Sequence, residues 1–234
     1  MPLLLISSNA SDMVAEGLDA PVQLYCADLS DMEAVDKLAS ELLAQQQRID
    51  VLINNAGVFK TPSPETADNL DVRFVVNTIA PYHLTHRLLP VIPHDGRVVN
   101  LSSAAQAPVD LSALQGPVSL DDFSAYAQSK LAITIWSSEL ARQLPDGPVI
   151  VAVNPGSLLA SKMVKEGFGV GGNDLSIGAE ILVKAALSEE FENASGMYFD
   201  NDAGRFSDPH PDAKDSAKNG MIVEAVEKVI SKLV

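Results

Sequence analysis

Tyr126 and Lys130 stand four residues apart in a stretch whose residue types suit acid–base chemistry. Between Phe123 and Leu144 there is no proline or glycine, and apolar residues recur every three to four positions, so we predict one amphipathic helix. That spacing places both side chains on one helix face. An ammonium group one turn away favours the phenolate and should lower the phenol pKa from about 10 toward neutral pH. Such a pair also arises by chance on surface helices, so the rest of the chain must decide between the two interpretations.

Short apolar runs alternate with helical patterns along the chain. Six runs have the length and composition of strands buried on both faces: 3–6, 22–26, 51–53, 98–101, 149–153 and 197–199. Helical patterns occur at 10–18, 31–46, 66–91, 123–144 and 175–188, and near 221–233 after a polar tail at 200–219 that we expect to be irregular. This alternation predicts an α/β fold, a doubly wound parallel sheet of about six strands forming a single domain over residues 1–234.

Polar residues follow four of these strands directly. In such a sheet, ligands bind at the carboxyl ends of the strands. The segments found there are Ala27-Asp28-Leu29-Ser30, Asn54-Asn55-Ala56-Gly57, Ser102-Ser103 and Asn154-Pro155-Gly156-Ser157. Each could be ordinary loop or capping chemistry by itself, but four at one sheet edge, with the Tyr126/Lys130 pair nearby, indicate a site.

Charge and cysteine content limit the possible partners and compartment. The formal net charge of −15 argues against nucleic acid or an anionic membrane surface as partner. Cys26 is the only cysteine, so neither a disulfide framework nor a thiolate metal site is expected. His83 and His86 are interpreted as core or surface histidines, and we expect no metal. The apolar start of the chain is too short to span a membrane, so we expect a cytoplasmic protein.

These motifs, in this order, resemble the short-chain dehydrogenase/reductase family. The resemblance is carried by Asn54-Asn55-Ala56-Gly57, by Asn77, by Ser103, by the Tyr126/Lys130 pair and by Asn154-Pro155-Gly156, and it runs from about residue 22 to residue 199. The long interval between Ser103 and Tyr126 is similar to that of the retinol-dehydrogenase-like branch. The family implies a Rossmann-like fold and an NAD(P)-dependent oxidoreductase that interconverts an alcohol and a carbonyl on a small or lipophilic molecule.

The resemblance implies four catalytic residues. Tyr126 would exchange a proton with the substrate oxygen, and Ser103 would hydrogen-bond the same oxygen. Lys130 would lower the pKa of Tyr126 and bind the nicotinamide ribose. Asn77 would interrupt its helix and hold a water that connects Lys130 to solvent; Pro81, one turn later, fits a distorted helix.

The same resemblance implies the contacts of the cofactor, NAD or NADP. Asp28 would meet the adenine, although the interpretation as a cap of the helix at 31–46 stays open. Asn55 and Gly57 would meet the adenosine ribose. The carboxamide would be met by Pro155, Gly156 and Leu158, and Ser161 would lie near the pyrophosphate.

The amino end departs from the family pattern. The family opens with a strand, a glycine-rich turn and a helix that receives the pyrophosphate, whereas the only glycine in residues 1–50 is Gly17. By spacing, residues 3–28 fit the family's second strand, second helix and third strand. In the family, the missing first strand lies in the middle of the sheet, between the second and fourth strands. If this slot stayed empty, buried backbone groups would be left unpaired at about 1–3 kcal/mol each. We therefore expect strand 3–6 to fill the slot and lie beside strand 51–53, with 22–26 as the sheet edge. Residues 7–11 would then replace the glycine turn and weaken cofactor binding.

Two functions therefore stay open. The first is the oxidoreductase described above, in a chain that lacks the first unit. The second is a catalytically impaired or truncated relative that serves as a binding or scaffold module on the same fold. The helices at 66–91 and 123–144 carry apolar residues on more than one face, including Leu84, Leu88, Ile135 and Trp136. Because family members usually pair through these helices, we expect a homodimer or homotetramer.

Overall fold

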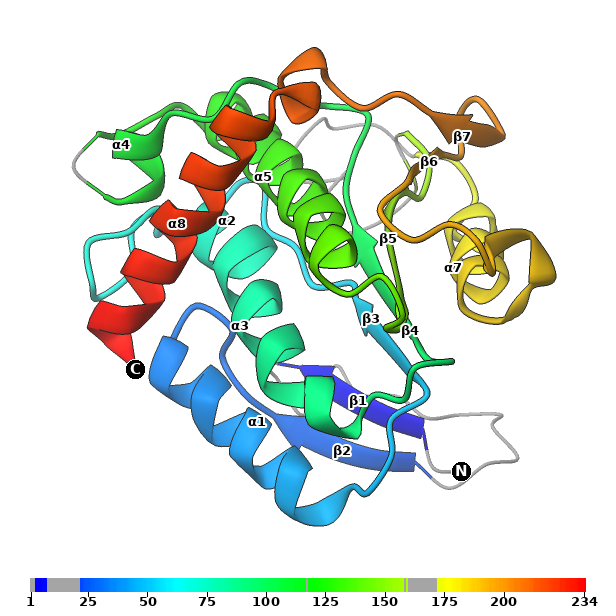
Figure 1. Cartoon of the computed structure of the whole chain (residues 1–234). Coiled ribbons are helices and arrows are strands. Elements are labelled where there is room, and N and C mark those ends of the chain that lie inside the picture. The colour runs from blue at the N-terminus through cyan, green and yellow to red at the C-terminus, as the bar shows by residue number, and fades with distance from the viewer. Residues whose placement is uncertain (1–2, 8–21, 117, 158, 160–171) are drawn as a thin grey trace.

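The strands form two separate sheets in the computed structural model, which describes residues 3–7, 22–116, 118–157, 159 and 172–234 (Figure 1). The larger sheet has the order β3-β4-β5-β6-β7. Its strands are β3 (Val51–Asn54), β4 (Arg97–Leu101), β5 (Val149–Asn154), β6 (Tyr198–Asp200) and β7 (Arg205–Ser207). The first four are parallel, and β7 runs antiparallel to β6. The smaller sheet pairs β1 (Leu3–Ser7) in parallel with β2 (Val22–Cys26).

Helices cover both faces of the larger sheet. The helices are α1 (Met32–Gln45), α2 (Val72–Phe74), α3 (Ala80–Leu88), α4 (Leu111–Leu114), α5 (Asp122–Gln143), α7 (Leu175–Leu187) and α8 (Ser216–Leu233). α3 and α5 lie on one face, with α8 across them, and α7 packs against β3 and β4 on the other (Figure 1). Alternate strand residues enter different cores: Val98 and Ile150 face α5, whereas Val99 and Val151 face α7. The uninterrupted apolar runs thus reflect burial on both faces, and the predicted α/β class is confirmed.

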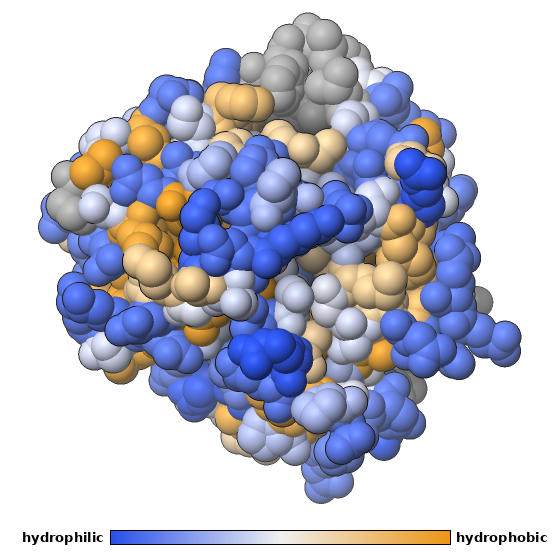
Figure 2. All heavy atoms as spheres, turned by 45° about the horizontal axis from the view of Figure 1, so that its top comes forward, coloured by the Kyte–Doolittle hydropathy of each residue, from blue (hydrophilic) through white to orange (hydrophobic). Residues whose placement is uncertain are grey.

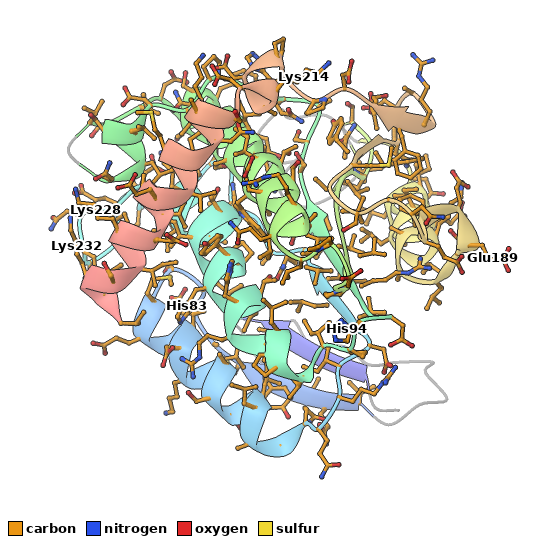
Figure 3. All side chains as sticks on the ribbon, in the orientation of Figure 1. His83, His94, Glu189, Lys214, Lys228 and Lys232 are labelled. Atoms are coloured by element: carbon orange, nitrogen blue, oxygen red, sulfur yellow. The ribbon has the colours of Figure 1, made fainter. Side chains whose placement is uncertain are left out.

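The predicted position of the first strand is wrong. β1 pairs with β2 as expected, but β3 pairs with β4 and with no other described strand, so β1 does not fill the slot beside β3. α1 packs against α3, and Tyr25 on β2 donates a 2.8 Å bond to Gln45 Oε1 at the end of α1; His83 on α3 contacts Asp36 on α1 at 2.8 Å (Figure 3). Ile53 on β3 is 39% exposed. Within the described residues, β3 is therefore partly accessible to solvent at Ile53, whereas the expectation assumed that this edge was fully buried.

Two helical or irregular segments also differ from expectation. The helix predicted over 66–91 begins at Val72 and contains a π-helix at Val75–Ile79, with a 3-10 turn at Leu89–Val91. The tail predicted to be irregular contains β7, a 3-10 turn at Pro211–Lys214 and the first turns of α8. Asp215 caps α8 by accepting bonds from Ala217 N and Lys218 N, which explains its early start. The helix predicted at 10–18 lies outside the described residues.

The apolar residues that predicted self-association are buried within the chain. Leu84, Leu88, Ile135 and Trp136 are at most 4% exposed. Their partners include α8, which packs against α5 and whose Glu227 accepts a 2.7 Å bond from Tyr82 on α3. The second apolar face of α3 and α5 is therefore buried in the core of the chain and is not available for pairing with another copy. No described helix has the length and apolar character needed to cross a bilayer.

Candidate active site

The Tyr126/Lys130 pair lies near the start of α5. Asp121 caps this helix by accepting bonds of 3.0 Å from Phe123 N and Ser124 N, and these donors, with the Ser124 hydroxyl, lower the pKa of its carboxyl. The helix then runs unbroken to Gln143, as its composition predicted. Tyr126 and Lys130 are therefore one turn apart, with the Lys130 Nζ atom 5.7 Å from the centroid of the Tyr126 ring.

Lys130 is buried beneath the end of β4. Its side chain is 4% exposed, and Nζ donates a 2.7 Å bond to the carbonyl oxygen of Leu101, the last residue of β4. Burial lowers the pKa of this lysine to about 8.

The Tyr126 pKa shifts in the direction opposite to that expected from the sequence. Burial of the phenol raises its pKa, and a hydrogen bond with the Ser103 side chain opposes the rise. The Lys130 ammonium does not reverse this rise, and its Nζ donates to the Leu101 carbonyl rather than to the phenol oxygen. The Ser103 and Tyr126 side chains therefore lie close together, an arrangement in which a phenol and a serine hydroxyl can meet one substrate oxygen.

Two residues that the sequence analysis missed hold the backbone of Ser103. Its carbonyl oxygen accepts bonds from Tyr198 OH at 3.1 Å and Gln106 Nε2 at 3.0 Å. Gln106 also accepts a 2.9 Å bond from His210 N, which ties the segment after β7 to the site. The signal for Tyr198 was a phenol in the middle of the otherwise apolar run 197–199. The preceding Ser102 is structural: its hydroxyl is 3.0 Å from the Lys130 carbonyl oxygen.

Asn77 lies in the π-helix and is fully buried. Its amide bonds both backbone groups of Val58, at 2.8 Å to the N–H and 2.9 Å to the carbonyl, and donates to Ser129 Oγ at 2.9 Å. Ser129 Oγ in turn donates to the Tyr126 carbonyl at 2.7 Å. The predicted interruption of the helix is confirmed, and Asn77 links the loop after β3 to α5. Its role in holding a water stays a prediction.

Phe59 is a further neighbour of the phenol that the sequence analysis missed. The ring is 5% exposed and packs edge-on against the Tyr126 ring, with centroids 5.1 Å apart. It follows the Asn-Asn-Ala-Gly motif by two residues. An aromatic residue there has many possible roles, so only the fold reveals this contact.

The segment after β5 is held in a tight conformation. Gly156 has a φ of +123°, which a residue with a side chain adopts only with strain. Asn154 donates to Asp200 and Asp202 at 2.8 and 2.9 Å, and Asp202 accepts a 2.8 Å bond from Ser157 N. Asp202 was missed because it lies in the tail. Pro155 and Gly156 are half-buried at the strand end as expected; Leu158 and Ser161 lie outside the described residues.

The residues predicted for the adenosine end are accessible at the ends of β2 and β3. Asp28 and Asn55 are exposed and Gly57 is half-buried. Asp28 accepts bonds from Ser30 N and Oγ at 2.9 and 2.7 Å, while Asp31, not Asp28, caps α1. Polar, accessible groups at these strand ends, with Lys130 and the constrained Gly156 at the other end, fit a dinucleotide. Within the described residues, no three His, Cys, Asp or Glu side chains cluster as a metal site.

Comparison with known proteins gives a consistent result. Residues 3–168 match the family model for short chain dehydrogenases. Retinol dehydrogenase 13 of Mus musculus is 30% identical over 226 residues, which cover 88% of this chain and 67% of that protein. Retinol dehydrogenase 12 of Mus musculus is 34% identical over 206 residues, covering 82% and 65%. The chain thus spans about two thirds of the length of these relatives.

Solved structures show the same fold. An uncharacterised protein from Mycobacterium Paratuberculosis superposes with a TM-score of 0.79 at 24% identity, covering 97% of this chain and 83% of that one. A short chain dehydrogenase from Burkholderia cenocepacia J2315, solved in complex with NADP, has a TM-score of 0.62 at 24% identity, covering 85% and 84%.

Proposed function

Because the chain belongs to the short-chain dehydrogenase/reductase family, we propose that it is an NAD(P)-dependent oxidoreductase that interconverts an alcohol and a carbonyl compound. One observation carries the proposal: the side chains of Ser103 and Tyr126 interact, one helical turn from buried Lys130. No finding favours the alternative of an impaired scaffold protein.

The side chains divide the reaction into clear tasks. In reduction, the Tyr126 phenol donates its proton to the carbonyl oxygen; in oxidation, the phenolate accepts the proton of the alcohol. Ser103 hydrogen-bonds the same oxygen, where negative charge develops. Its backbone is fixed by Tyr198 and Gln106, so this donor is positioned before substrate arrives. NAD or NADP, when bound, supplies or accepts the hydride at the carbon.

The cofactor would be held from both ends of the site. Asp28, Asn55 and Gly57 would contact the adenosine, and Lys130 with the Pro155–Gly156 segment would contact the nicotinamide half. Asp202 accepts hydrogen bonds from the Asn154 amide and from Ser157 N. These bonds fix the Pro155–Gly156 segment on both sides of Gly156, in the place where it would contact the cofactor. We expect affinity weaker than that of a reductase with a glycine-rich turn, because residues 1–50 contain a single glycine, Gly17, and no such turn to approach the pyrophosphate closely.

The substrate is a lipophilic alcohol or aldehyde. Support comes from the relatives named retinol dehydrogenases, which are 30–34% identical, and from the buried Phe59 ring, which places an apolar surface against Tyr126.

Self-association and a cytoplasmic location complete the proposal. A homodimer or homotetramer would use a surface other than α3 and α5, whose apolar residues are buried. Exposed apolar residues on α7 support such a surface: Ile177, Val183 and Leu187 are 44%, 58% and 72% exposed. The cytoplasmic location is supported by the single cysteine and the net charge of −15. The charge also disfavours nucleic acid, and hydrophilic residues dominate the face shown in Figure 2.

Nicotinamide fluorescence tests the function directly. The purified chain is titrated with NADH and with NADPH, and turnover is followed at 340 nm with all-trans-retinal and, separately, benzaldehyde. For at least one cofactor we expect a dissociation constant above about 1 μM, on the order of the weaker enzyme–substrate affinities. We also expect turnover that is lost in Tyr126→Phe. Absence of both binding and turnover in a folded sample would contradict the proposal and favour the scaffold function.

A further inference from the structure

Arg73 is a buried cation that joins three segments around the site. Its side chain is 1% exposed. Nε and Nη2 bind the two carboxylate oxygens of Asp71 at 2.8 and 2.6 Å, and Nη1 contacts the carboxylate of Asp122 and donates to the Phe59 carbonyl at 3.4 Å. A guanidinium is the group suited to such a fixed fork of contacts.

Two of these contacts, with Asp122 and with the Phe59 carbonyl, lead to Tyr126. Asp122 lies in the first turn of α5, four residues before Tyr126 and therefore on the same helix face. Phe59, whose carbonyl Arg73 binds, packs its ring against the phenol ring. Arg73 thus touches both the helix that carries the phenol and the residue that packs on it.

A second anchor makes the Val58–Phe59 segment rigid. Asn77 bonds both backbone groups of Val58, and Arg73 bonds the carbonyl of the next residue. The two anchors, Arg73 and Asn77, are four residues apart in one helical stretch: Arg73 lies in α2 and Asn77 in the π-helix that follows it. The loop after β3 is therefore fixed against this stretch at two consecutive residues.

We propose that Arg73 is a positioning residue for the reaction: through the Phe59 carbonyl and Asp122, it sets the place of the Tyr126 phenol in the site. This rests on the proposed function, in which that phenol exchanges a proton with the substrate oxygen. Proton transfer needs a heavy-atom separation of about 2.6–3.2 Å, and a misplacement of about 1 Å costs about 100-fold in rate. Charge pairing alone would stabilise the fold without this effect on the phenol.

Four variants separate positioning from stability. Arg73→Lys keeps the positive charge and loses the forked contacts of the guanidinium. Phe59→Leu removes the aromatic ring and keeps the backbone carbonyl that Arg73 contacts. The double variant combines both changes. Asp122→Asn should still fold, because the Asp122 side chain is 43% exposed. The matched control is Arg142→Lys, which alters an ion pair with Glu139 near the other end of the same helix. Circular dichroism and thermal melting confirm folding of each variant.

Two readouts are measured for each variant. The first is kcat and KM for NADPH-dependent reduction of all-trans-retinal. The second, made without cofactor or substrate, is the NMR signal of ¹³Cζ-labelled tyrosine, with the Tyr126 resonance assigned from its loss in Tyr126→Phe. Tyrosine occurs only four times in the chain, so the spectrum is simple.

We expect Arg73→Lys and Phe59→Leu each to lower kcat about 10- to 100-fold, with KM for NADPH changed less than about threefold, and to move the Tyr126 resonance. Asp122→Asn should move the Tyr126 resonance in the same direction by a smaller amount, and Arg142→Lys should leave it in place.

The double variant should have a kcat no lower than that of the slower single variant, because both changes interrupt the same connection between Arg73 and the phenol. Multiplicative losses in the double variant, or an unmoved resonance in Arg73→Lys, would overturn the proposal. If Arg73→Lys does not fold, an unmoved resonance in Phe59→Leu and Asp122→Asn overturns it. A wild-type chain without turnover would contradict the proposed function, while the resonance would still test Arg73.

Discussion

Lys130→Met should change how stability depends on pH. Lys130 is an ammonium group held in a buried position with one 2.7 Å bond to the Leu101 carbonyl, and burial lowers its pKa to about 8. Methionine fills a similar volume and carries no titratable proton. The difference in unfolding free energy between wild type and variant therefore isolates the titration of this one side chain.

The magnitude follows from the pKa. A fall from 10.5 to about 8 corresponds to about 3 kcal/mol, at about 1.4 kcal/mol per pH unit. Below pH 8 the folded chain carries the charge and this penalty is fully present. Between pH 8 and 10.5 the unfolded chain binds more protons than the folded chain, so stability rises with pH. About 2 kcal/mol of wild-type stability relative to the variant should be regained between pH 7 and 9.5. Tyr126, whose pKa is raised above its ordinary value of 10.0, should titrate above this window.

Urea unfolding at half-unit steps from pH 7 to 9.5 measures this difference. Lys228→Met is the matched control, because Lys228 is exposed and projects outward from α8 (Figure 3); its difference from wild type should vary by less than about 0.5 kcal/mol. Parallel pH profiles for wild type and Lys130→Met would show that the lysine is not held charged in a dry site, and would refute the reasoning.

Three further predictions use other features. Tyr126→Phe should remove most of kcat and leave cofactor affinity within about threefold, because only the proton-donating hydroxyl is lost; retained turnover would contradict its role. Asp202→Ala should raise the dissociation constant for NADPH about 5- to 30-fold, equivalent to about 1–2 kcal/mol for lost bonds to Ser157 N and Asn154, whereas Asp208→Ala, an exposed acidic residue beyond β7, should not. Light scattering at 10 μM should give a dimer or tetramer that Leu187→Lys on exposed α7 dissociates; a wild-type monomer would count against self-association.

The strands and the catalytic pair were predictable because their signals are local. Runs such as 149–153 are apolar at every position because Ile150 and Val151 enter different cores. Ser103, Tyr126 and Lys130 were found because parallel strands bring their carboxyl ends to one edge and because helical spacing aligns residues four apart.

The contacts that tune the site depend on segments far apart in sequence. Tyr198 reaches Ser103 across 95 residues, and Arg73 reaches Asp122 across 49. The direction of the Tyr126 pKa depends on burial by such neighbours, which spacing along one helix does not reveal. The prediction for β1 failed for a related reason: β1 pairs with β2, which is tied to α1 by the bond from Tyr25 to Gln45 across 20 residues, and α1 packs on α3.

The position of α8 has a consequence for synthesis on the ribosome. This helix buries Ile222, Val226 and Val229 in the core that contains Trp136 of α5. A chain emerges amino end first, at about 5–20 residues per second. The apolar back of α5 therefore stays uncovered for several seconds after Trp136 has been made, until residues 216–233 leave the exit tunnel. During that interval it is a surface on which a chaperone could act.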